Sequence, residues 1–119
     1  MLGRGDAAER AVQTAAVRSV LDRYRLAFST LSVDGLGTVW RTVDTKALAK
    51  AFGQLETQTV EFDTCQIDIN GDVAQASCSG RTSFVPKVGS KSPRVDSRRW
   101  TFQLVRVRGG WVIDQAQSR

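Results

Sequence analysis

The sequence predicts an α+β protein in which N-terminal helices pack on a strongly curved antiparallel sheet. Apolar residues recur at steps of three and four before residue 57, and they alternate with polar residues after it. Glycine-containing turns separate the alternating segments, as is typical of a meander. Helices followed by strands indicate separate layers and not an alternating parallel sheet.

The chain has 119 residues, which suits one domain, so residues 1–119 are treated as a single unit. Residues 1–10 are expected to be a flexible tail or a linker stub. The composition, 41% hydrophobic and 24% charged, is that of a folded chain. The sequence contains no apolar run that could span a membrane and no secretion signal. We therefore expect a cytoplasmic protein that does not engage a membrane, or a piece of a longer protein.

Three helices are expected in the first half of the chain. Asp6 is a candidate for the N-cap of the first helix. Asp34 would cap a short second helix, and Asp44 would cap a third that ends near Gly53. The apolar stripe predicted for the first helix comprises Val17, Val20, Leu21, Tyr24, either Ala27 or Phe28, and Leu31.

Four strands are expected after residue 57. The inward parity changes near Asp63 in the first strand and near Val105 in the third, so a bulge is expected in each. A three-residue loop at 108–110 would set Val107 against Trp111. The predicted strands are residues 58–70, 72–85, 94–108 and 111–113, with an exposed loop at 86–93.

Two cysteines lie on either side of a short turn. If residues 71–72 form the loop, Cys65 faces Cys78; if residues 70–71 form it, Cys65 faces Ala76. We favour the first register because every inward pair is then apolar. Opposed cysteines can form a disulfide, but two buried free thiols are the favoured interpretation for a cytoplasmic protein. Two cysteines without histidine make a poor metal site, so no metal is expected.

Positive charge is concentrated late in the chain. The net charge is +5, and the segment from Arg81 to Arg108 contains eight cations and one anion, Asp96. Such an excess suits an anionic small molecule, an acidic protein or nucleic acid. Nucleic acid is not expected, because the nearby aromatic residues alternate like core residues. A solvated strand face is the interpretation we favour.

Several segments resemble the NTF2-like superfamily, the SnoaL-like and cystatin-related α+β cone proteins. The resemblance covers roughly residues 12–117 and rests on the opening helix L-D-R-Y-R-L-A-F, the hairpin I-D-I-N-G-D-V-A and the ending R-W-T-F-Q-L-V-R-V-R-G-G-W-V-I. It implies a hollow cone and a homodimer that pairs through the outer faces of its sheets. Members include dehydratases, isomerases, epoxide hydrolases, transport factors and non-catalytic association domains, so the fold does not select the function.

The resemblance also implies positions for catalysis. Members similar to ketosteroid isomerase use a tyrosine on the first helix, an aspartate base and an acidic donor on a late strand. Tyr24 matches the tyrosine, Asp63 is the nearest candidate base, and Arg98 stands where the late acid would be. Other enzymes of the family rely on histidine, and this chain has none. Tyr24 and Asp63 are therefore weak catalytic candidates.

A ligand hollow is expected inside the cone, with Arg98 at its mouth to meet an anion. The alternative is that the aromatic rings fill the cone. We predict a non-catalytic NTF2-like domain that binds a small apolar or anionic ligand or a second copy of itself, with no cofactor. A lyase or isomerase that acts on a small apolar substrate is the alternative. The residues expected to line the hollow are Tyr24, Trp40, Phe52, Arg98, Trp100 and Phe102.

Overall fold

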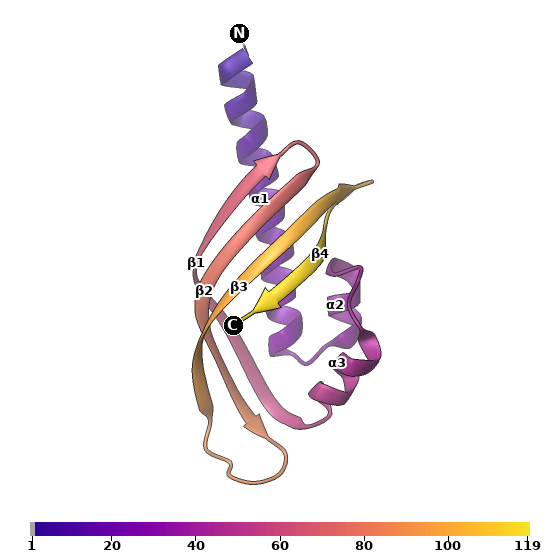
Figure 1. The fold of residues 1–119 in the computed structure, drawn as a ribbon, viewed down its shortest axis with the longest axis vertical. Helices are drawn as coiled ribbons and strands as arrows, with labels where there is room; N and C mark the ends of the chain where they lie inside the picture. The colour runs from indigo at the N-terminus through magenta and orange to yellow at the C-terminus, as the bar shows by residue number, and fades with distance from the viewer. Residues whose placement is uncertain (1) are drawn as a thin grey trace.

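The computed structural model describes residues 2–119, with side chains from Ala7 onward. Three helices precede four strands that form one curved antiparallel sheet in the order β1-β2-β3-β4. Helix α1 runs behind the sheet in Figure 1, and α2 and α3 lie beside it. This arrangement confirms the predicted α+β class. The elements are α1 (Leu2–Ser29), α2 (Val33–Val39), α3 (Thr45–Phe52), β1 (Leu55–Asn70), β2 (Val73–Pro86), β3 (Arg94–Val107) and β4 (Gly110–Ser118).

The helix starts agree with the predictions in one case out of three. Helix α1 begins at Leu2, so Asp6 lies inside it and does not cap it; residues 2–10, expected as a tail or stub, are helical. Ser32 caps α2, because its Oγ accepts the N–H of Gly35 at 2.9 Å. Asp34 lies in the first turn, where a carboxylate favours the helix dipole without capping it. Asp44 caps α3 as predicted.

The predicted apolar stripe faces the sheet, but its last member, Leu31, is not part of α1, because the helix ends at Ser29 and Leu31 has a φ of 54°. One of its members, Tyr24, is only 5% exposed. Strand β4, at one edge of the sheet, also contacts α1, because the indole Nε1 of Trp111 donates a hydrogen bond to Oε1 of Gln13 at 2.8 Å. No helix in the described part of the chain is both long enough and apolar enough to cross a membrane. The buried stripe residues are Val17, Val20, Leu21, Tyr24 and Ala27.

Strands β1 and β2 pair in the favoured register. Cys65 faces Cys78, and residues 71–72 form the turn. Gly71 has a φ of 63°, in the left-handed region that glycine adopts without strain. The inward residues of the hairpin are therefore the apolar ones, as the alternation predicted.

The predicted bulge in β1 is also present. The register shifts between Phe62 and Thr64, so Asp63 is the extra residue. Opposite the bulge, a Cβ at Gly80 would lie 1.8 Å from the main-chain oxygen of Glu61. Only glycine allows this close approach, and bulges of this kind bend and twist the sheet.

The turn between β3 and β4 differs from the prediction. Val107 pairs with Gly110, so the turn has two residues instead of three. Arg106, and not Val107, therefore lies opposite Trp111. The physical reason is burial: this register sends Trp111 to the inner face of the sheet together with Leu104, and both are buried.

The second bulge lies on β4 and not on β3. Gln103 pairs with Gln115 and Leu104 pairs with Ile113, which leaves Asp114 as the extra residue. The alternation of β3 continues unbroken past Val105, which stays on the outer face of the sheet. The predicted bulge near Val105 is therefore wrong.

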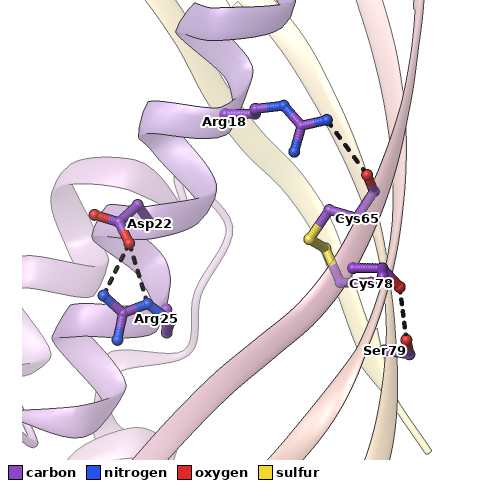
Figure 2. The surroundings of a disulfide bond; sticks show 7 residues. Arg18, Asp22, Arg25, Cys65, Cys78 and Ser79 are labelled. Carbon is purple, nitrogen blue, oxygen red and sulfur yellow. Dashed lines mark hydrogen bonds and ion pairs between the residues drawn. A yellow bond between two sulfur atoms is a disulfide. The ribbon is translucent and has the colours of Figure 1, made fainter.

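Cys65 and Cys78 form a disulfide, with their Cα atoms 4.1 Å apart (Figure 2). The favoured interpretation as two free thiols is wrong for this structure. It rested on an expected cytoplasmic location, whereas the strand register alone sets the two side chains opposite each other on one face. The location itself stays a prediction.

Candidate functional site

Tyr24 lies at the centre of a group of aromatic rings inside the cone. Its ring centroid is 4.8 Å from that of Phe28, 4.9 Å from that of Phe102 and 6.0 Å from that of Trp40. These spacings are those of rings in contact, and tilted or edge-on arrangements are the favourable ones. The structure therefore brings together Tyr24, Trp40 and Phe102, which the sequence placed at one site.

Two further rings, which the predicted site omitted, complete this group. The ring of Phe28 contacts that of Phe52, with centroids 5.5 Å apart, and so connects Phe52 to the group around Tyr24. Phe62 lies 4.9 Å from Trp100 and 6.1 Å from Phe102. Phe28 follows Tyr24 by one helical turn, so the spacing did signal it, although the sequence left Ala27 as an equal choice. Phe62 precedes the bulge and shares the parity of its strand's buried residue Val60.

These seven rings occupy the interior where a ligand hollow was expected. Trp100 and Phe102 are each 3% exposed, and no charged side chain is fully buried among the described residues. Burial raises the pKa of the Tyr24 hydroxyl above its ordinary value, because desolvation penalises the tyrosinate. Across the chain from Ala7 onward, no hydrogen bond joins that hydroxyl to a carboxylate. The geometry resembles a packed core more than an acid–base site.

The two charged candidates lie outside the buried core. Asp63 is exposed on the β1 bulge, with Oδ1 3.7 Å from Nη2 of Arg81. Arg98 is half-buried and its Nη2 lies 3.8 Å from Oδ2 of Asp96. Neither forms a hydrogen bond or an ion pair with Tyr24 in the described residues. Within the same limits, His, Cys, Asp and Glu side chains form no cluster that could hold a metal ion.

A groove of about 310 Å³ runs between α1 and β1. Figure 2 shows Arg18 reaching from α1 toward Cys65, with Asp22 and Arg25 paired farther along the helix. Nη2 of Arg18 lies 3.5 Å from the main-chain oxygen of Cys65, and Arg25 pairs with Asp22 at 2.8 Å. The groove is also lined by Asp63, so its two cations are matched by two carboxylates. It therefore offers no excess charge to attract an ion.

The outer face of the sheet, opposite the helices, carries three transverse rows of polar side chains. Each row takes one residue from each strand, because the registers of the three strand pairs line them up. The amide row is Asp68, Gln75, Gln103 and Gln115. The hydroxyl row is Gln66, Ser77, Thr101 and Gln117. The arginine row is Thr64, Ser79, Arg99 and Arg119.

Two hollows lie on this outer face. One of about 240 Å³ is lined by side chains of the amide and hydroxyl rows. The other, of about 510 Å³, is lined by side chains of the hydroxyl and arginine rows. These rows were not predicted from the sequence, because they form only through the register of all four strands.

Comparisons with known proteins identify the fold. No protein-family model matches the sequence, and no curated protein matches it significantly. Among solved structures, an NTF2-like superfamily protein from Salmonella enterica serovar Typhimurium superposes with a TM-score of 0.83 at 11% identity, over 92% of each chain. A hexachlorocyclohexane dehydrochlorinase, LinA type 2, gives a TM-score of 0.78 at 9% identity, over 95% of this chain and 88% of its own. A protein of unknown function from Mycobacterium tuberculosis gives a TM-score of 0.77 at 15% identity, over 98% of this chain and 76% of its own.

Proposed function

We propose, on the premise that the chain has the NTF2-like fold, that it is a non-catalytic association domain that pairs with a second copy of itself. The contact would use the outer face of the sheet. The observation that carries this proposal is the contrast between the two faces: aromatic rings fill the inner side, whereas the outer side presents open rows of amide and hydroxyl groups.

The interior supports binding or catalysis less well. The rings around Tyr24 are in mutual contact, so an apolar ligand would have to displace them. A lyase or isomerase would need a base or acid next to the tyrosine, and neither Asp63 nor Arg98 is bonded to it. The solved neighbours include a dehydrochlorinase, but identity this low carries the fold and not the chemistry.

The amide and hydroxyl rows suit contact with an identical surface. In a two-fold interface the same patch meets itself, so the groups of the patch must be complementary to one another. Glutamine amides and hydroxyl groups both donate and accept hydrogen bonds, so they satisfy this condition. A patch with charges of one sign would not satisfy it, because it would repel its own copy, and Asp68 is the single charged member of these two rows. Depletion of charge is typical of the centre of an interface.

The outer face is also large enough for a stable dimer. Four strands spaced by about 4.8 Å make a sheet about 19 Å wide, and a 14-residue strand is about 46 Å long. The product, about 870 Å², is close to the roughly 800 Å² that each partner buries in a standard interface. Next to the amide row, Val105 pairs with Val112, and both are partly buried, which adds apolar area.

The test is the mass of the protein in solution. Analytical ultracentrifugation from low micromolar to near-millimolar concentration should show a monomer–dimer equilibrium. Gln103→Arg places a charge in the amide row, where the proposed contact would bury it, and we expect it to weaken dimerisation at least tenfold. Gln54→Arg, an equal change at an exposed position outside the sheet, should leave dimerisation unaltered.

A wild-type chain that stays monomeric over the whole range would contradict the proposal. So would a Gln103→Arg variant that dimerises as tightly as the wild type, because the contact would then lie elsewhere. Circular dichroism of both variants checks that the substitutions leave the fold intact.

A further inference from the structure

The hollow of about 510 Å³ on the outer face contains two arginines at adjacent positions on neighbouring strands. The N–H of Arg99 donates to the main-chain oxygen of Arg119 at 3.1 Å, and the N–H of Arg119 donates back at 2.9 Å. This reciprocal pair sets the two residues directly opposite each other, with their side chains on the same face of the sheet. Two guanidinium groups therefore share one hollow.

This arrangement is unfavourable unless something negative is nearby. Like charges directly opposite each other in a sheet destabilise it. In the described chain neither Arg99 nor Arg119 forms an ion pair or a side-chain hydrogen bond, and no carboxylate side chain lines the hollow. The carboxylates on the adjoining part of β1, Glu61 and Asp63, both lie within 4 Å of a different cation, Arg81. Neither arginine therefore has an ion-pair partner among the described side chains.

The rest of the hollow supplies neutral hydrogen-bonding groups. The hydroxyls of Thr64 and Ser79, the other two members of the arginine row, lie 2.9 Å apart. Ser77 and Thr101 of the hydroxyl row also line the hollow. Guanidinium groups bind carboxylates and phosphates with two parallel hydrogen bonds, and hydroxyls can donate to the remaining oxygens. A tetrahedral oxyanion can use donors that approach from several sides at once.

We infer that this hollow, the arginine hollow, is a binding site for a small molecule that carries a phosphate group. Arg99 and Arg119 hold the phosphate oxygens, and the neighbouring hydroxyls donate to it. The hollow falls within the range of about 300–1,000 Å³ typical of small-molecule sites, so it suits an organic phosphate better than the bare ion. The inference does not depend on self-association, although the hollow shares Ser77 and Thr101 of the hydroxyl row with the proposed contact.

The test is a titration followed by two-dimensional ¹⁵N NMR in a chloride buffer, with inorganic phosphate and then glycerol phosphate as probes. We expect the amide signals of Ser79, Arg99 and Thr101 to shift in a saturable way, with glycerol phosphate binding at least as tightly as phosphate. Arg99→Gln with Arg119→Gln should weaken both probes at least tenfold. Arg106→Gln removes one positive charge from the same strand on the opposite face, and it should leave binding unchanged.

Equal affinity in the double variant and the wild type would overturn the inference. So would shifts confined to other residues, or shifts that rise linearly with phosphate and never saturate. Vesicles containing phosphatidic acid provide a further arm. One combination of results would reject the small-molecule site in favour of a lipid surface. In it, the wild type co-sediments with these vesicles while the double variant does not, and glycerol phosphate shows no saturable binding. Ultracentrifugation of the double variant distinguishes phosphate binding from self-association. A double variant that no longer binds phosphate but still dimerises has lost the arginine hollow alone.

Discussion

The inner and outer faces of the sheet are built from alternate residues of the same strands, yet they have different roles. On β3, Phe102 points inward and is 3% exposed, whereas its neighbours Thr101 and Gln103 point outward and are exposed. The inner residues contact α1 and one another through aromatic rings. The outer residues leave their amide and hydroxyl groups open. The inner face therefore specifies the fold, whereas the polar groups of the outer face stay accessible to solvent.

The largest expected effect comes from removing a ring on the inner face. Phe102→Ala deletes the ring that joins Tyr24 to Phe62, and a deletion of this kind costs about 3–5 kcal/mol of unfolding free energy. Thr101→Ala, next to it on the outer face, should change the unfolding free energy by less than about 0.5 kcal/mol. Urea denaturation of both variants measures the difference. Similar losses in the two variants would mean that the faces are not distinct.

A smaller difference is expected between two links that join β1 to β2. The Cys65–Cys78 disulfide lies on the inner face, and replacing both cysteines with alanine should lower the unfolding free energy by about 3 kcal/mol at most. The hydrogen bond between Thr64 and Ser79 lies on the outer face, and its removal should cost about 1 kcal/mol or less. Urea denaturation under non-reducing conditions compares the two, and a double-alanine cysteine variant as stable as the wild type would contradict the first value.

The sequence predicted the inner face better than the outer one, for a physical reason. A buried face requires apolar residues at a fixed period, so each strand carries the signal by itself, and apolar pairing selected the register that sets Cys65 against Cys78. The outer rows give no such signal. Gln75, Gln103 and Gln115 become neighbours only through the registers of three strands, and the last register was predicted incorrectly at the turn after Val107.

The sequence also left open whether the cone is hollow or filled. That outcome depends on how closely α1 approaches the sheet. The bulge at Asp63 and the glycine opposite it bend the sheet and so influence this distance. Phe28 and Phe62 decide it, because they close the gaps between the rings that the sequence had identified. The spacing along each element indicates that both residues point inward, but the contacts that close the gaps form only when the helix packs on the sheet.

Burial of Tyr24 also makes stability depend on pH. Desolvation raises the pKa of its hydroxyl in the folded state, so this group contributes stability that is fully present below its unfolded pKa of about 10. That contribution is lost as the pH rises above about 10, because the unfolded chain then loses the proton first. Tyr24→Phe should remove this part of the alkaline decline in unfolding free energy.

The most direct test of the filled cone is a titration of tyrosinate absorbance, because the chain contains a single tyrosine. Circular dichroism recorded in parallel reports whether the fold persists. Packed rings predict that tyrosinate appears only well above pH 10, together with loss of the fold. Ionisation near pH 10 in a chain that remains folded would show that water reaches the Tyr24 hydroxyl, and would contradict a filled interior.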